Sequence, residues 1–159
     1  FSLIVVFLYI LIRFRKWQFS LGAVVALLHD VLFVMGVFSL ADGFLPFQLE
    51  VDQAFIAAIL TVIGYSLNDT VVVFDRIREN MGSRGKQNGV SVNKSLNQTL
   101  SRTFNTSLTT FFVLLVIFLF GGEVIRGFMF ALLLGVLVGT YSSLFIATPV
   151  MFDASDKES

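Results

Sequence analysis

The 159-residue chain contains no cysteine and only one histidine, His29. Without cysteine, a disulfide framework and a thiolate metal site are excluded, and a single histidine leaves little for a histidine-based metal site. Charged side chains are also scarce, at 14% of the residues, compared with about 25% in a typical soluble domain. Because 56% of the residues are hydrophobic, the composition is that of a membrane protein and not of a water-soluble globule.

The first residue, Phe1, lies within a hydrophobic run, with no initiator methionine and no charged segment before it. A signal peptide would begin with a basic segment ahead of its apolar region. We therefore expect Phe1 to be an internal residue of a longer polypeptide.

Five hydrophobic stretches alternate with more polar segments, at residues 1–12, 19–40, 55–74, 104–120 and 128–151. The four later stretches have about 17–24 residues, and at about 1.5 Å per residue each can cross a hydrocarbon core of roughly 30 Å. Helices are expected, because a lipid-exposed backbone must satisfy its hydrogen bonds within each segment and the stretches lack the alternation of barrel strands. We predict an all-α membrane protein with a five-helix bundle at 1–152 and a tail at 153–159.

The segments between these stretches differ in charge, although the formal net charge of the chain is zero. Lys and Arg are found in the first gap, the third gap and the tail: Arg13, Arg15, Lys16, Arg76, Arg78, Arg84, Lys86, Lys94 and Lys157. The second gap, 41–53, has acidic residues only, and the fourth, 121–127, has one charge of each sign. Since basic loops stay in the cytoplasm, we predict that the first and third gaps and the C-terminus are cytoplasmic.

The polar segment 79–94 contains three glycines. It lacks the Gly-x-x-x-x-Gly-Lys-Ser/Thr pattern of a phosphate-binding loop, so we predict a flexible cytoplasmic loop. From Val92 onward, Leu96 and Leu100 follow at helical spacing, which indicates a helix near the membrane surface before the fourth span.

Polar side chains recur at helical spacing inside or beside two of the spans. Those of the third span are Thr61, Tyr65, Asn68 and Asp69, and those leading into the fourth are Arg102, Asn105, Thr106 and Thr109. Each set occupies one face of a helix. We therefore expect the two polar faces to turn away from lipid and to meet.

Asp69 and Arg102 are the charged members of these two faces. Asp69 lies seven residues before Arg76, roughly 10 Å inside the membrane boundary, and Arg102 lies eight residues after Lys94, roughly 12 Å inside. A lone ionised side chain at the centre of a membrane costs at least about 2.5–3.5 kcal/mol, which favours pairing or proton uptake. The alternatives are a structural ion pair and an Arg102 that extends to the interface. We predict an ion-coupling pair, with Asn68 as a weaker candidate.

Asp30 is a second weaker candidate for the ion path. It shares a helix face with Gly22 and Ala26, so we expect it to point into the bundle along a seam of small residues. Hydrogen bonding to a neighbouring helix is the simpler role for this carboxylate. In the last span, Gly135, Gly139 and Ser143 form a face of the kind that lets helices approach closely, and Asp52 is expected to cap the helix that follows it.

The residues around Asp69 resemble the signature region of the SecF family. The segment is 51–80, VDQAFIAAILTVIGYSLNDTVVVFDRIREN. Three shorter blocks resemble the same family: LHD at 28–30, SLNQTLSRT at 95–103 and FGG at 120–122. They occur in the order found in the family and cover nearly the whole chain.

The resemblance implies a transmembrane helix bundle of the RND superfamily, in which this chain holds helices two to six of a six-helix SecF half. Proteins of this family work in the bacterial cytoplasmic (inner) membrane with SecD, separate or fused upstream, beside the SecYEG channel, and YajC and YidC are further expected partners. They use the proton gradient, in some organisms the sodium gradient, to promote export of preproteins. The aspartate and arginine that couple the ion in the family match Asp69 and Arg102. The resemblance implies no enzyme, no cofactor besides the transported ion and no nucleic-acid partner.

Three other functional classes remain open at this stage. Half of an RND-type small-molecule or lipid efflux transporter would have similar helices but is expected to differ from the signature at 68–80. A structural scaffold for the export channel would need no functional Asp69. A membrane enzyme is least favoured, because the sequence has no constellation of nucleophile and base or of metal ligands.

The alternation of basic gaps predicts opposite labelling of the two sides of the membrane. A single cysteine at Ser39 should react with an impermeant thiol reagent from the outside, and one at Ser83 only from the cytoplasmic side. The measurement is labelling of intact cells against inverted vesicles. Labelling of both positions from the same side would contradict the topology.

Overall fold

The structure, a computed structural model, describes residues 1–47, 49–81 and 89–156, excluding the side chain of Asp156. Within these ranges it contains helices and no strand. In chain order the α-helices are α1 (Ser2–Phe14), α2 (Trp17–Ala41), α3 (Gln53–Glu79), α4 (Gly89–Phe120), α5 (Arg126–Ser142) and α6 (Thr148–Asp156), with a 3₁₀ turn at Glu123–Ile125 and a π-helical turn at Ser143–Ala147. The all-α class predicted from the sequence is confirmed.

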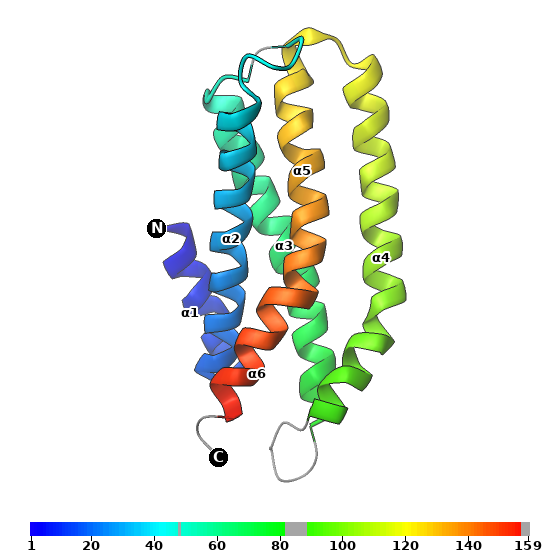
Figure 1. The fold of residues 1–159 in the computed structure, drawn as a ribbon. Coiled ribbons are helices and arrows are strands. Elements are labelled where there is room, and N and C mark those ends of the chain that lie inside the picture. The colour runs from blue at the N-terminus through cyan, green and yellow to red at the C-terminus, as the bar shows by residue number, and fades with distance from the viewer. Residues whose placement is uncertain (48, 82–88, 157–159) are drawn as a thin grey trace.

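Four helices, α2, α3, α4 and α5, run side by side along the bundle, and α1 lies against one half of α2 (Figure 1). In the described part of the chain, four helical segments are long and apolar enough to cross a membrane: Trp17–Ala41, Gln53–Glu79, Gly89–Phe120 and Glu123–Ser155. The α1–α2 connection, the end of α3, the start of α4 and the end of α6 lie at one end of the bundle, and the end of α2, the start of α3 and the α4–α5 connection lie at the opposite end (Figure 1). This arrangement is the one required if the basic gaps share one side of the membrane.

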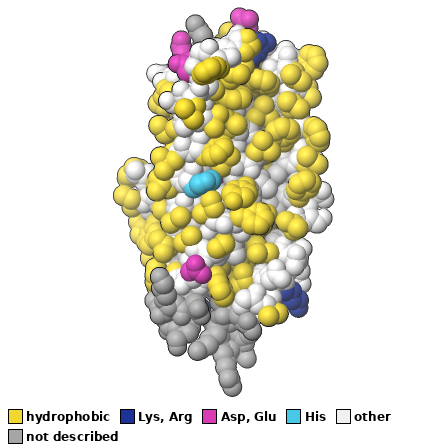
Figure 2. Space-filling view, viewed as in Figure 1, with side chains coloured by type: hydrophobic (Ala, Val, Ile, Leu, Met, Phe, Trp, Pro, Cys, Tyr) yellow, Lys and Arg dark blue, Asp and Glu magenta, His cyan; other side chains and the backbone are white. Residues whose placement is uncertain are grey.

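Hydrophobic side chains cover the middle of the bundle in Figure 2, and the acidic and basic side chains visible in this view lie toward its two ends. His29 is the exception, because it lies on this face near mid-height (Figure 2). An apolar belt between charged ends is the surface expected of a protein that spans a bilayer.

The start of α3 follows from its sequence. The Asp52 carboxylate accepts a hydrogen bond of 2.8 Å from the backbone N–H of Phe55, which satisfies one of the unpaired donors at the helix N-terminus. The capping role predicted for Asp52 is confirmed.

The last hydrophobic stretch, 128–151, is not one straight helix. It comprises α5, the π-helical turn and α6, and the direction of the chain changes between α5 and α6 (Figure 1). Pro149 has no backbone N–H and cannot bond the carbonyl four residues earlier, which accounts for the disturbed turn directly before it. The Thr148 hydroxyl donates to the carbonyl of Ser143, five residues earlier, at 3.2 Å.

The predicted loop at 79–94 is partly helical. Helix α4 already begins at Gly89, and residues 82–88 of the predicted loop lie outside the described residues. The early start of α4 is stabilised by contacts with the bundle, since Val92 and Ser95 are buried and Ser95 accepts a hydrogen bond from Asn80 at 2.9 Å. In the predicted tail, 153–159, the helix α6 extends to Asp156, and 157–159 lie outside the described residues.

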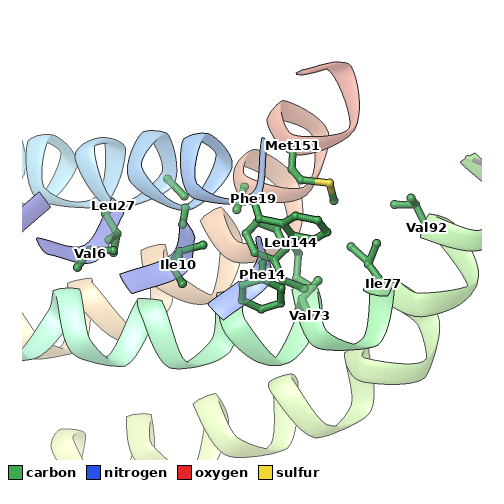
Figure 3. Close-up of a cluster of buried hydrophobic side chains, with 14 of the residues drawn as sticks. Val6, Ile10, Phe14, Phe19, Leu27, Val73, Ile77, Val92, Leu144 and Met151 are labelled. Carbon is green, nitrogen blue, oxygen red and sulfur yellow. The ribbon is translucent and has the colours of Figure 1, made fainter. Parts of the chain in front are cut away.

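Two clusters of buried apolar side chains hold the helices together, one toward each end of the bundle. In the first, the ring of Phe19 stacks on Phe14 at 5.0 Å and meets Phe74 edge-on at 5.1 Å, which joins α1, α2 and α3. Figure 3 shows this cluster, with Met151 of α6 on its margin. In the second, Phe38 of α2 packs on Phe55 of α3 at 4.5 Å.

Gly22 lies where α2 closely approaches the π-helical turn and the start of α6. A Cβ atom at this position would overlap with the carbonyl oxygen of Ala147 and lie 3.0 Å from Cβ of Met151. The glycine is therefore required by the close approach of these segments, as predicted for the small-residue seam of the second span.

We expect Gly22→Ala to lower the free energy of unfolding by about 1–3 kcal/mol, because the overlap forces α2 away from the π-helical turn. The matched control is Gly64→Ala on α3, where no atom lies within 4 Å of the added Cβ and where the better helix propensity of alanine gains up to about 1 kcal/mol. The measurement is thermal unfolding of the full-length protein in detergent. Equal midpoints for the two variants would contradict the close contact.

Candidate ion-coupling site

Asp69 is buried where three helices meet. Its side chain on α3 is 4% exposed, and it accepts a hydrogen bond from the Ser107 hydroxyl of α4 at 3.4 Å. Ser107 in turn accepts from the hydroxyls of Thr140 on α5, at 2.6 Å, and Tyr65 on α3, at 3.3 Å. The polar contacts of this carboxylate therefore depend on the relative positions of α3, α4 and α5.

The hydrogen bonds available to Asp69 depend on its protonation state. An ionised Asp69 only accepts hydrogen bonds, whereas a protonated Asp69 also carries an O–H that can donate to Ser107. Because Ser107 is shared with Thr140 and Tyr65, a reversal at Asp69 changes the hydrogen bonding between α4 and α5. Protonation also removes a charge that is costly at membrane depth.

Arg102 lies on α4, and the structure does not pair it with Asp69. It is exposed, and the ion pairs found within 4.0 Å among the described residues do not include it. Its side chain lines a polar cavity of about 360 Å³ between α3 and α4, together with Val72, Asp75, Arg76, Glu79, Gln98 and Thr99. Asp69 is not among the residues that line this cavity.

The prediction that the two polar faces meet is borne out only on the α3 side: Tyr65 and Asp69 contact α4, but they do so through Ser107, which is not a member of the predicted α4 set. Asn68 and Thr61 on α3 are exposed, and so are Arg102 and the rest of the polar set on α4, namely Asn105, Thr106 and Thr109. Helix α4 packs against the bundle through a different face, formed by Val92, Ser95, Thr99, Thr103 and Ser107. These residues are rotated by about 100° from the predicted ones, because Thr103 and Ser107 each follow a member of the predicted set by one residue.

The buried face of α4 differs from the predicted one, although its pattern is visible in the sequence. Ser95, Thr99, Thr103 and Ser107 recur at every fourth position, which places four hydroxyl side chains on one face of a helix. Serine and threonine are common at exposed positions too, so the pattern did not reveal which of two polar faces would be buried.

Asp30 is fully buried between α2, α3 and α5. One of its oxygens accepts hydrogen bonds from Ser66, at 2.6 Å, and Ser142, at 2.8 Å, and the other lies 3.3 Å from Nδ1 of His29. As expected, the carboxylate points into the bundle. Its hydroxyl partners come from two neighbouring helices, α3 and α5. These bonds are the hydrogen bonding to neighbouring helices that is the simpler alternative to a place in the ion path.

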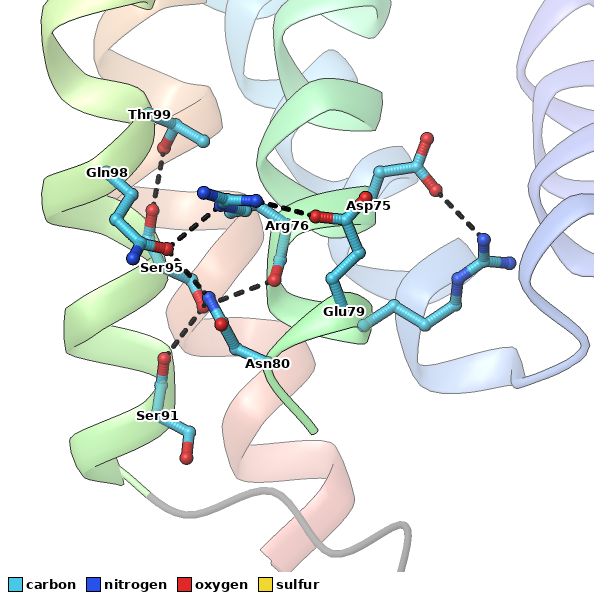
Figure 4. Close-up of polar contacts among 9 residues, drawn as sticks. Asp75, Arg76, Glu79, Asn80, Ser91, Ser95, Gln98 and Thr99 are labelled. Carbon is cyan, nitrogen blue, oxygen red and sulfur yellow. Dashed lines mark hydrogen bonds and ion pairs between the residues drawn. The ribbon is translucent and has the colours of Figure 1, made fainter. Parts of the chain in front are cut away.

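A hydrogen-bond network joins α3 and α4 at the end of the bundle that carries the basic gaps (Figure 4). Arg76 donates to Gln98 at 2.9 Å and pairs with Glu79 at 2.8 Å, while Asn80 donates to both Gln98 and Ser95 at 2.9 Å. Arg76, Glu79 and Gln98 of this network also line the polar cavity, so the two lie at the same end of α3 and α4.

Nearly the whole chain is similar to known protein-export membrane proteins. A family model described as protein export membrane protein SecD/SecF, C-terminal, matches residues 1–157. The protein translocase subunit SecF of Rhodothermus marinus is 61% identical over 153 residues, which cover 96% of this chain and 49% of that protein. The SecF subunit of Vibrio alginolyticus is 51% identical over 148 residues, covering 92% of this chain and 45% of that protein. The chain thus spans about half the length of the curated relatives it matches.

A solved structure shares the fold. The crystal structure of SecDF in its Super-membrane-facing form superposes with a TM-score of 0.87 at 41% sequence identity, and the match covers 98% of this chain and 20% of that one. The helix bundle described above therefore has the fold of the matching part of SecDF, and the predicted fold class is confirmed.

The Asp30 cluster predicts a loss of stability when its acceptor is removed. Asp30→Leu leaves the buried hydroxyls of Ser66 and Ser142 without this partner, and we expect the free energy of unfolding to fall by about 1–3 kcal/mol. The control is Asp42→Leu, because Asp42 is exposed at the end of α2. Denaturant unfolding of the full-length protein in detergent compares the two, and an Asp30→Leu protein as stable as the control would disprove the structural role.

Proposed function

The chain belongs to the SecD/SecF family of protein-export membrane proteins, and we propose that it is the membrane-embedded part of a SecF-type subunit that uses an ion gradient to promote protein export across the bacterial cytoplasmic membrane. The chain is a multi-pass membrane protein. The observation that carries the proposal is the burial of Asp69 at the junction of α3, α4 and α5, with Ser107 as its hydrogen-bond donor.

In the proposed cycle, Asp69 takes up a proton from the outer side and releases it to the cytoplasm. Protonation reverses the hydrogen bond with Ser107, which in turn changes the contact between Ser107 and Thr140 of α5. A proton that crosses roughly 150 mV releases about 3.5 kcal/mol, enough to shift a two-state equilibrium by roughly 300-fold. The free energy of one proton is thus of the size needed to drive a helix movement.

Arg102 acts in this proposal as the mobile partner of the Asp69 charge. It is exposed beside the polar cavity. Because its long side chain is not held by packing, the guanidinium can move relative to α4. When Asp69 is ionised, approach of the guanidinium offsets the cost of a charge at membrane depth, and when Asp69 is protonated this attraction is lost. Sodium would be the coupling ion in place of the proton if Asp69 binds the metal ion instead.

The exposed polar face of α3 and α4 supports a membrane partner. Asn68, Arg102, Asn105 and Thr106 are exposed within long apolar helices, and polar side chains at membrane depth face the interior of a bundle or a water-filled cavity. We propose that SecD, separate or fused upstream, covers this face, and that the pair works beside the SecYEG channel with YajC and YidC as accessory partners. The relatives are protein translocase subunits, so the efflux alternative gains no support.

Substitution of the coupling pair tests this function. We expect Asp69→Asn, which is nearly isosteric, to abolish the stimulation of export by the proton gradient while the complex still assembles. Arg102→Met should do the same, and Arg102→Lys should retain part of the stimulation because it keeps the charge but loses the planar donor group. The measurement is export of a secreted substrate into inverted vesicles with and without a gradient.

The control is Asp52→Asn, because asparagine also caps a helix and Asp52 lies at the N-terminus of α3, far along the helix from Asp69. This variant should keep the full stimulation. Undiminished stimulation in Asp69→Asn would reduce Asp69 to a structural residue.

A further inference from the structure

The buried face of α4 carries a continuous row of hydroxyl side chains, which we call the hydroxyl row: Ser95, Thr99, Thr103 and Ser107. Their exposed fractions are 0%, 6%, 1% and 7%. A buried helix face is ordinarily lined with apolar side chains, yet each buried position of α4 from 95 to 107 is Ser or Thr. At about 1.5 Å per residue the row extends for roughly 18 Å along the helix.

The two ends of the hydroxyl row meet different parts of the protein. At one end, Ser107 donates to Asp69 at 3.4 Å. At the other end, Ser95 takes part in the polar network of Figure 4, where it accepts from Asn80 at 2.9 Å and donates to the carbonyl of Ser91 at 2.7 Å. Thr99 lies between them and lines the polar cavity beside Arg102. The row therefore extends from the candidate ion site to the cavity at the basic end of the bundle.

Thr103 is the residue of the row whose hydroxyl is unsatisfied. Its Oγ1 is buried and has no hydrogen-bond partner among the described residues. Thr99, Thr106 and Thr110 on the same helix each donate to the carbonyl four residues earlier, whereas Thr103 does not make this bond. A buried hydroxyl without a partner is costly, and an ordered water is the usual means of satisfying it.

We propose that the hydroxyl row is the cytoplasmic branch of the proton path, in which Thr103 binds the water that links Asp69 to the polar cavity. This inference rests on the proposed function, because it presumes that Asp69 takes up the transported proton. The Asp69 carboxyl gives its proton to this water while the water gives one of its own protons to the hydroxyl oxygen of Thr99, and the Thr99 hydroxyl passes its original proton to solvent water in the polar cavity. Asp69 is left as a carboxylate, the water is unchanged, and one proton has moved toward the basic end of the bundle.

The test compares isosteric Thr→Val changes on α4 in the full-length protein, assembled with its partners in inverted vesicles. We expect Thr103→Val to lower the rate of gradient-stimulated export by roughly threefold to tenfold, the effect of losing one hydrogen bond in the path. Thr103→Ser should restore the rate because it keeps the hydroxyl. The matched control, Thr110→Val, removes a hydroxyl that bonds to its own helix and should leave the rate unchanged.

A second variant covers the case in which Thr103→Val does not accumulate. Thr99→Val removes the next hydroxyl of the row, at the cavity, and should lower the same rate while export without a gradient is unaffected. Wild-type stimulation in both variants would overturn the proposal. An equal loss in Thr110→Val would also overturn it, since the effect would then come from helix packing.

Asp69→Asn in the same assay separates this inference from the function on which it rests. Loss of stimulation in Asp69→Asn with full stimulation in Thr103→Val would leave Asp69 as the coupling residue and exclude the hydroxyl row. Retained stimulation in Asp69→Asn would instead reject the proposed function. Stimulation by a sodium gradient alone, with the proton gradient collapsed, would overturn the proton path through Thr103.

Discussion

The close packing of α5 against α3 is the contact on which both buried carboxylates depend. At Gly135 an added Cβ would overlap with the side chain of Val62, and at Gly139 it would lie 3.0 Å from Cβ of Ser66. The two glycines stand one helical turn apart on α5, so they form a groove in which α3 lies. Small residues of this kind let helices approach in a membrane, where packing and not the hydrophobic effect drives helix association.

Beside this contact, hydroxyl side chains of α5 bond to residues of the two helices α4 and α2. Thr140 bonds Ser107, the donor to Asp69, and two residues further Ser142 bonds Asp30. A rotation or shift of α5 would therefore alter the surroundings of both carboxylates together. The π-helical turn begins directly after Ser142, and such turns are frequent at functional sites. Asp30 and Asp69 are thus linked by hydrogen bonds to α5, directly or through Ser107, close to the residue at which the regular α-helix ends.

Helix α4 has two polar faces with different roles. The hydroxyl row packs into the bundle and reaches Asp69, while Arg102 and the residues that follow it at helical spacing are exposed. Short hydroxyl side chains can be buried when a backbone carbonyl or a water satisfies them, as the bond from Thr99 to the carbonyl of Ser95 shows. A guanidinium has five donors and always carries a charge, so it requires solvent or a partner of opposite charge. Burial of the hydroxyl face therefore costs less than burial of the Arg102 face would.

The sequence by itself determined the helices, their order and the cap at Asp52, because these depend on hydrophobic runs and local hydrogen bonds between near neighbours. It also placed Asp30 and Asp69 inside apolar segments where a charge is costly. Only the tertiary structure decided which face of α4 is buried. Both faces are polar and both repeat at helical spacing, so the choice depended on contacts with α3 and α5, which come from distant parts of the chain. Arg102 was left on the exposed face of α4 in the same way, since the rotation of a helix about its axis depends on its packing against other helices.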